Sequence, residues 1–125
     1  MRFGLTRMEA LLAALGNPQH GRHSIHIVGS NGKSSTTRFC AALLEGEGLS
    51  TGAYLSPHLG GWHERVEVNG APVPPEQFAA AVMRVADAAA GLELEPGDAV
   101  TQFEGVTAAA FLVFAEAGCA WQVIE

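Results

Sequence analysis

The sequence predicts an α/β fold: a three-layer domain with a mostly parallel sheet and a phosphate-binding loop. Residues Ser24–Val28 are rich in β-branched side chains typical of a short buried strand, and a glycine-punctuated turn joins them to a helix that begins at Lys33. A second short strand, Thr51–Leu55, follows that helix, and this order implies a parallel crossover. Ala120–Glu125 follows another helical segment and predicts a third parallel strand.

The composition is typical of one globular domain. The 125 residues are 48% hydrophobic and 16% charged, which excludes a disordered chain. The formal net charge is −6, and 7 Lys and Arg residues are too few for a broad nucleic-acid surface. The longest apolar run, Val106–Ala115, is about half of the ~20 residues that a membrane span requires. We therefore expect a cytoplasmic protein without a nucleic-acid or membrane partner.

The two cysteines, Cys40 and Cys119, lie in apolar stretches and lack the C-x-x-C spacing of redox or zinc sites. This favours reduced thiols in the core of a cytosolic protein. A disulfide between them is the minor alternative.

Two helices are predicted in the first half of the chain from apolar residues at helical spacing. The first is a lead-in helix over Leu5–Leu15, whose apolar face is expected to contain Leu5, Met8, Leu12 and Leu15. The second runs from Lys33 to about Glu47 and ends at Gly48, which is suited to a left-handed cap. Its buried stripe is expected to contain Phe39, Cys40, Leu43 and Leu44.

The second half predicts a hairpin, two more helices and the last strand. Arg65–Val68 alternates before the turn signal Asn69-Gly70, so we expect a β-hairpin there. A helix opens at Pro74 and Pro75, with its apolar face at Phe78, Val82, Val85, Ala86 and Ala89. Another helix runs from Gln102 to about Ala117 and is capped by Gly118. The side chains expected to face the core are Phe103, Val106, Ala110 and Phe114. The last strand stops at Glu125 without a turn, so we expect a fragment of a longer protein.

The glycine-rich turn has the short pattern G-x-x-G-K-S over Gly29–Ser34. Glycines at 29 and 32 would let backbone N–H groups approach an anion at the helix start, and Lys33 would reach the outer phosphates. A hydroxyl at Ser34 or Ser35 is placed to approach a phosphate or its metal. The strict nucleotide-loop pattern needs a further glycine where Ile27 stands. The alternative is a glycine-rich turn with a solvated lysine.

Three other positions have both a structural and a functional interpretation. Thr101–Glu104 is a capping-box sequence, so Glu104 either caps a helix or binds Mg²⁺ near the phosphates. Ser56 is either a turn residue before proline or a hydroxyl ligand of the same ion. His58 and His63 lack a third metal ligand at recognisable spacing, which favours solvated or substrate-facing histidines.

Taken together, these segments resemble the N-terminal part of the folylpolyglutamate synthase and dihydrofolate synthase family, within the Mur ligase superfamily. The motifs of the family occur in this chain in the same order. In the lead-in and the loop, G-L-x-R-M corresponds to Gly4–Met8, L-G-N-P to Leu15–Pro18 and H-V-A-G-T-N-G-K-G-S to His26–Ser35. Further along the chain, S-P-H-L corresponds to Ser56–Leu59, E-R-I-x-V-N-G to Glu64–Gly70 and T-x-F-E-x-x-T-x-x-A-F to Thr101–Phe111. Ser30 replaces the family's threonine, Ser34 its glycine and Val66 its isoleucine. The resemblance implies the N-terminal part of the central ATPase domain, without the C-terminal ligase domain.

The resemblance also implies roles for single residues. ATP would be bound by Ser30, Asn31, Gly32 and Lys33, with Lys33 as the catalytic cation. The loop pattern itself adds Gly29, Ser34 and Ser35 to the predicted ATP site. Mg²⁺ would be held by Ser56 and Glu104. The pteroate part of the substrate would contact Arg2, Phe3, His58, Phe111 and Leu112.

The activity implied by the resemblance is ATP-dependent ligation of L-glutamate to a folate or dihydropteroate carboxylate through an acyl phosphate. We expect the full-length protein to be a monomer and residues 1–125 alone to be inactive in ligation. Whether the substrate is dihydropteroate, a tetrahydrofolate or both stays open. The alternatives are a small-molecule kinase with a phosphate loop and a nucleotide-binding module without catalysis.

Overall fold

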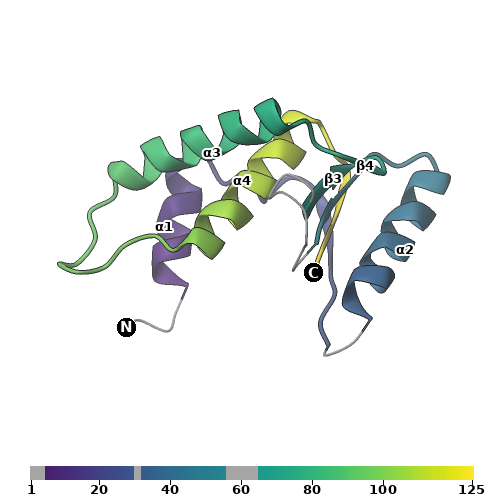
Figure 1. The fold of residues 1–125 in the computed structure, drawn as a ribbon, viewed down its shortest axis with the longest axis horizontal. Helices are drawn as coiled ribbons and strands as arrows, with labels where there is room; N and C mark the ends of the chain where they lie inside the picture. The colour runs from purple at the N-terminus through teal and green to yellow at the C-terminus, as the bar shows by residue number, and fades with distance from the viewer. Residues whose placement is uncertain (1–4, 30–31, 56–64) are drawn as a thin grey trace.

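The computed structural model describes residues 5–29, 32–55 and 65–125. Figure 1 shows helices on both sides of a central sheet, with α2 on one side and α1, α3 and α4 on the other. The helices are α1 (Thr6–Ala14), α2 (Lys33–Gly46), α3 (Pro75–Ala90) and α4 (Gln102–Glu116). The strands are β1 (His23–His26), β2 (Thr51–Tyr54), β3 (Val66–Val68), β4 (Ala71–Pro72) and β5 (Trp121–Ile124).

The sheet has the strand order β1-β5-β2-β3-β4. Strands β1, β5 and β2 are parallel, whereas β3 is antiparallel to β2 and β4 is antiparallel to β3. The last strand therefore lies between the first two, with Val123 opposite Ile25 on one side and Ala53 on the other. These findings confirm the predicted α/β fold with a mostly parallel sheet.

The hairpin prediction is also confirmed. Asn69 and Gly70 form the turn between β3 and β4 with φ values of 51° and 85°, the left-handed conformation that a tight hairpin turn requires. The Asn69 side chain accepts a hydrogen bond from the Thr51 N–H at 2.9 Å. This bond ties the hairpin turn to the start of β2.

Helix α2 packs on one face of the sheet through small side chains. Thr37 and Ala41 are buried, whereas Phe39 is 67% and Leu43 57% exposed, so the predicted stripe is wrong at these two positions. Phe39 lies two residues after the buried Thr37, and Leu43 lies two residues after the buried Ala41. Two residues of an α-helix turn through about 200°, so both apolar side chains lie on the opposite side of the helix from the buried ones. The predicted Cys40 and Leu44 do pack against this face.

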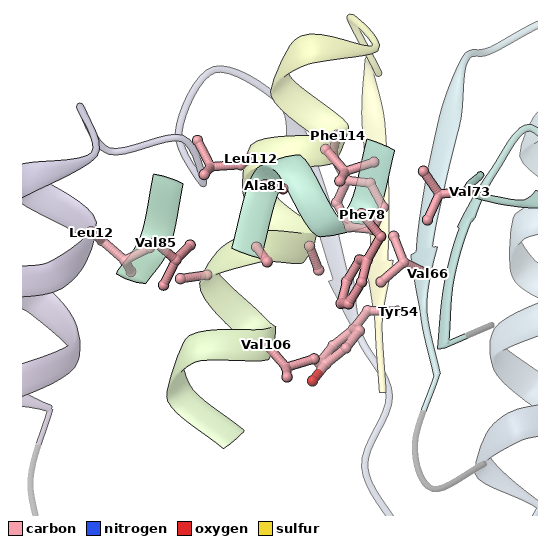
Figure 2. Packing of buried hydrophobic residues seen from close by; sticks show 14 of the residues in the cluster. Leu12, Tyr54, Val66, Val73, Phe78, Ala81, Val85, Val106, Leu112 and Phe114 are labelled. Atoms are coloured by element: carbon pink, nitrogen blue, oxygen red, sulfur yellow. The ribbon is translucent and has the colours of Figure 1, made fainter. Parts of the chain in front are cut away.

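The main core lies on the opposite face of the sheet and is centred on α4 (Figure 2). The buried residues of α4 are Val106, Ala108, Ala109, Ala110, Leu112, Val113 and Phe114. This confirms three of the four inward residues predicted for this helix, but Phe103, in its first turn, is 61% exposed. In α3, Phe78 and Val85 are buried as predicted, together with Ala81, whereas Val82 and Ala86 are exposed.

Two further predictions of burial are wrong. Leu5 is 70% exposed because it precedes α1. The rest of the predicted face is confirmed, since Leu12 is buried together with Leu11, and Met8 and Leu15 pack against the core. Strand β1 was expected to be buried, but His23, Ser24 and His26 are exposed. Among the described residues β1 pairs only with β5, which leaves it at the edge of the sheet.

Both cysteines are free thiols, as predicted, with Cys119 buried and Cys40 half-buried. Burial raises the pKa of the Cys119 thiol. None of the described helices has the length and hydropathy needed to cross a bilayer.

Helix α4 begins with the predicted capping box. The Glu104 N–H donates to the Thr101 hydroxyl at 3.1 Å, and the Thr101 N–H donates to Glu104 Oε1 at 2.9 Å. Arg7 of α1 donates from Nε to the same Oε1 at 2.7 Å, and another of its nitrogens contacts Asp98. The Arg7, Asp98 and Glu104 side chains are 14–17% exposed, so this ion-pair network ties α1 to the start of α4.

Gly52 marks the tightest contact between the sheet and α4. A Cβ atom added at this position would lie 2.3 Å from the Phe114 ring, which is completely buried. Only a residue without a side chain lets this ring lie directly on β2.

We expect Gly52→Ala to lower the free energy of unfolding by about 1–3 kcal/mol or more, because the added methyl group overpacks the core. Chemical denaturation measures this change. Gly46→Ala is the matched control, since no atom lies within 4 Å of the added Cβ there. Equal losses of stability in the two variants would contradict the proposed clash with Phe114.

The network at Glu104 predicts a pH-dependent stability. Burial alone would raise the pKa of Glu104. Hydrogen bonds from Arg7 and Thr101 outweigh burial and hold this pKa below its usual 4.5. The ionised carboxylate therefore stabilises the fold above pH 4.5, and this contribution is lost as the pH falls through the lowered folded-state pKa. We expect Glu104→Gln to be less stable than the wild type at neutral pH, with a difference that shrinks in acid.

Unfolding curves across this pH range test the prediction. If Arg7 is the partner of Glu104, the Glu104→Gln substitution should lower the free energy of unfolding by less in an Arg7→Met background than in the wild type. A stability difference between the wild type and Glu104→Gln that stays constant from neutral to strongly acidic pH would contradict the prediction.

Candidate functional site

The described residues of the junction between β1 and α2 have two features that suit a phosphate-binding loop, two glycines with positive φ and a helix that begins directly after the second. Gly29 has φ +147° and Gly32 has φ +73°, and both values lie in the region that favours glycine. Gly32 is the N-cap of α2, and Lys33 is its first residue. The predicted strand before the turn and the helix that begins at Lys33 are confirmed, whereas Ser30 and Asn31, in the middle of the turn, lie outside the described residues.

The first turn of α2 is suited to bind an anion. Gly32 has no side chain to cap the helix, and the first turn contains no acidic residue. Backbone N–H groups at such a helix start attract phosphate. Lys33 lies close to Gly29, since its Cγ would be 4.0 Å from a Cβ added there. Lys33 is also the only lysine in the sequence.

Of the two serines that follow the lysine, Ser34 is half-buried and Ser35 is exposed. The Ser34 hydroxyl lies 3.2 Å from Oε1 and 3.1 Å from Oε2 of Glu125. The sequence predicts Glu125 only as the end of a strand, and none of the motifs indicates it as a site residue. The structure thus adds one carboxylate to the candidate site.

The position of Glu125 follows from the sheet. It comes directly after β5, its N–H donates to the Tyr54 carbonyl at 2.9 Å, and the Ile27 N–H donates to the Ile124 carbonyl at 2.7 Å. The carboxyl end of β5 is therefore held between the ends of β1 and β2. Ligands of parallel α/β sheets bind at this edge. An acidic residue at the end of a predicted parallel strand was the signal that would have identified Glu125.

Glu104 lies in a different environment. Its carboxylate closes the capping box and accepts a hydrogen bond from Arg7, so the structural interpretation of this residue is confirmed. A cation would have to compete with Arg7 for the same oxygen. Its role as a metal ligand stays a prediction. Among the described residues, no group of three His, Cys, Asp or Glu side chains is arranged to hold a metal ion.

The remaining predicted site residues are only partly described. Arg2, Phe3, Ser56, His58 and His63 lie outside the described residues. Phe111 is half-buried, and Leu112 is buried within the main core (Figure 2). Their predicted contacts with the substrate stay predictions.

An apolar groove of about 520 Å³ lies between α3 and the start of α4. Its lining includes the exposed Val82, the buried Phe78 and Val106, and the polar Gln102. The groove belongs to the helical layer and includes none of the residues of the glycine turn.

Comparison with protein-family models gives no match. Among characterised proteins, the chain is 38% identical over 113 residues to dihydrofolate synthase/folylpolyglutamate synthase of Bacillus subtilis, covering 90% of this chain and 26% of that protein. It is 38% identical over 128 residues to the protein of the same description from Mycobacterium tuberculosis, covering 97% of this chain and 26% of that protein.

Solved structures give the same result. Folylpolyglutamate synthase of Mycobacterium tuberculosis in complex with ADP superposes with a TM-score of 0.93 at 38% identity, covering 99% of this chain and 29% of that one. The enzyme of Thermotoga maritima superposes with a TM-score of 0.92 at 35% identity, covering 100% of this chain and 30% of that one. A complex of folylpolyglutamate synthase with AMPPCP and folate has a TM-score of 0.88 at 37% identity, with 100% and 32% covered.

The chain spans between a quarter and a third of the length of these proteins. The matches cover 90–100% of this chain at 35–38% identity. The resemblance inferred from the motifs is confirmed, and the chain is a homologue of the folylpolyglutamate synthases and dihydrofolate synthases.

Proposed function

We propose that this chain supplies the ATP-binding part of a ligase that joins L-glutamate to a folate or dihydropteroate carboxylate. The observation that carries the proposal is the glycine turn between β1 and α2, where Gly29 and Gly32 adopt positive φ and Lys33 begins the helix. Relatives with this fold have been solved with ADP, AMPPCP and folate, which supports ATP and a folate as the substrates.

The loop would bind ATP through its backbone and its single lysine. The N–H groups at the start of α2 face an anion without a competing acidic side chain in the first turn. Lys33 would neutralise charge on the γ-phosphate as it is transferred. Positioning and electrostatic stabilisation of this kind provide most of the catalysis in phosphoryl transfer.

Mg²⁺ is the proposed cofactor, and the loop side chains fit it. It prefers hard oxygen ligands at 2.0–2.1 Å, so two neighbouring ligands of its octahedron lie about 2.9 Å apart. Ser34 Oγ and Glu125 Oε2 are 3.1 Å apart, close to that spacing. We propose that Ser34 and Glu125 hold the ion together with phosphate oxygens. Ser56 and Glu104 remain candidate ligands from the family resemblance.

The proposed reaction has two steps. A carboxylate oxygen of the folate attacks the γ-phosphorus of ATP, the bond to the β-phosphate oxygen breaks, and ADP leaves. The amine of L-glutamate then attacks the acyl carbon and displaces phosphate, which gives the amide after loss of a proton. In the first step this chain would orient the γ-phosphate and offset the developing negative charge, while Mg²⁺ supplies further positive charge when bound.

We propose that the protein acts in the cytoplasm, where ATP is available and the free thiols of Cys40 and Cys119 stay reduced. We also propose that the full-length protein acts as a monomer.

Lys33→Ala tests ATP binding by the loop. We expect at least about tenfold weaker binding of ATP in the presence of Mg²⁺, because the side chain that neutralises the outer phosphates is removed. Isothermal titration calorimetry measures the affinity. Because Lys33 is the only lysine, protection by ATP against an amine-reactive reagent, read by mass spectrometry, is a second measurement.

Arg38→Ala is the matched control for Lys33→Ala. It removes an equal charge from the same helix, but Arg38 is directed toward Glu67, 3.5 Å away, and is half-exposed. We expect its ATP affinity to stay within about twofold of the wild type, as for an exposed ion pair remote from the ligand. Equal effects of the two substitutions would overturn the assignment of the loop.

We expect residues 1–125 to bind ATP without ligating glutamate to any folate. The chain spans only 26–32% of the length of its relatives, so we infer that the residues that hold glutamate lie in the part that it does not span. Incubation with ATP, Mg²⁺, L-glutamate and dihydropteroate or tetrahydrofolate, followed by chromatography of the folates, measures the product. Formation of the longer glutamyl product by this chain would contradict the prediction.

A further inference from the structure

Strand β1 leads into the glycine turn, and its apolar side chains do not fix its register in the sheet. The strand has four residues, and among the described residues it pairs only with β5. Ile25 and the following Ile27 are two positions apart, chemically identical, and packed against the same cluster below α2. A shift of β1 by two residues would put Ile27 in the place of Ile25 and keep every side chain on its own face.

On the opposite face, the side chain of Gln122 distinguishes the observed register. In that register Ser24 lies opposite Gln122. Gln122 Nε2 donates to the Ser24 hydroxyl at 2.7 Å and to the main-chain carbonyl of Gln19, in the segment that leads into β1, at 3.3 Å. A hydroxyl can also donate, so the bond to Ser24 forms in either orientation of the amide. A shift by two residues would carry Ser24 about 6.6 Å along β5 and break this contact.

The amide of Gln122 is costly for the stability of the fold. Gln122 is 2% exposed, and its Oε1 has no hydrogen-bond partner among the described residues. A buried polar atom without a partner costs free energy, and a leucine of similar size would avoid that cost. Buried polar groups can favour one arrangement over its alternatives at the expense of stability. Gln122 is placed for such a role, because it faces the strand whose register the apolar pattern leaves open.

We propose that Gln122 is a positioning residue for the nucleotide site, because its buried amide fixes the register of β1 on β5. A shift of β1 by two residues would move the start of the glycine turn by about 6.6 Å relative to the carboxyl end of β5. The inference rests on the proposed function, because it assumes that the turn binds ATP. It goes beyond that function by naming a residue outside the turn that determines where the turn lies.

The test compares Gln122→Leu with the wild type, both as the 125-residue chain. Isothermal titration calorimetry in excess MgCl₂ measures the affinity for ATP, and chemical denaturation measures the stability. We expect ATP to bind at least about tenfold more weakly, which corresponds to the observed register in about one molecule in ten. The denaturation midpoint is expected to stay the same or to rise, because the buried Oε1 is removed. A loss of affinity without a loss of stability is not expected of a residue that only supports the fold.

Hydrogen exchange measured by NMR reports on the register without ATP. The His23 N–H donates to the Ala120 carbonyl at 3.0 Å, and the Ile27 N–H donates to the Ile124 carbonyl at 2.7 Å. Because both bonds must break when β1 shifts, we expect these two amides to exchange at least about tenfold faster in Gln122→Leu. The amides of β2, which does not pair with β1, are expected to keep their rates.

Three further variants separate the bond from other effects of substitution. Ser24→Ala removes the hydroxyl from an exposed residue and is expected to weaken ATP binding as Gln122→Leu does. Ser24→Thr keeps the hydroxyl and is expected to bind ATP within about twofold of the wild type. Thr51→Val is the matched control, because it removes a buried hydroxyl that donates to the Leu49 carbonyl at 2.9 Å, away from β1. It is expected to lower the denaturation midpoint and to leave the affinity unchanged.

The outcomes distinguish this inference from the proposed function. If the folded Gln122→Leu variant binds Mg²⁺–ATP within about twofold of the wild type, or loses affinity and stability together, the inference is overturned and the proposed function stands. If this variant does not fold, Ser24→Ala decides: unchanged affinity overturns the inference, and weaker binding that Ser24→Thr restores supports it.

A wild type that binds no Mg²⁺–ATP would show that the proposed function is wrong. The assignment of Gln122 to the nucleotide site would then fall as well. The exchange rates of β1 would still decide whether Gln122 fixes the register, because that measurement does not depend on ATP. Unchanged rates in Gln122→Leu overturn the inference whatever the affinities are.

Discussion

The architecture depends on the insertion of β5 between β1 and β2. Both strands pair with β5 on its two sides, and β2 pairs with β3 on its other side. The buried Gln122 of β5 strengthens this connection, because its Nε2 donates to the Ser24 hydroxyl at 2.7 Å. The insertion brings the carboxyl ends of three parallel strands to one edge. The glycine turn after β1 and the carboxylate after β5 become neighbours for this reason alone.

Local sequence signals predicted most of the secondary structure. Glycine and proline positions marked the ends of elements correctly, as at the Asn69-Gly70 turn and the start of α3 at Pro75, because backbone conformation there depends on the residue itself. The capping box at Thr101 was predictable for the same reason. The loop was predictable because Gly29 and Gly32 are required by their own φ values. Each of these features is determined within a few residues of sequence.

The predictions that were wrong depend on contacts between distant segments. Phe39 and Leu43 are apolar at helical spacing, but α2 meets the sheet through smaller residues on another side. Strand β1 has the composition of a buried strand, yet its position at the edge of the sheet is decided by strand order. Glu125 follows a predicted parallel strand, which was a local signal for the site, but its contact with Ser34 depends on the strand order that places β5 next to β1. Periodicity shows that a surface is apolar, but not which element covers it.

The pairing of β1 with β5 also bears on how the protein is made. Ser24 and Gln122, which are bonded in the folded sheet, are 98 positions apart in the chain. Contacts of such long range form late and slow folding. During translation, β1 and α2 leave the ribosome long before β5 exists, so the apolar face of α2 has no complete sheet to cover. The glycine turn between β1 and α2 therefore reaches its final surroundings only after nearly all of these residues have been synthesised, and until then apolar surface of the nascent chain is exposed to aggregation.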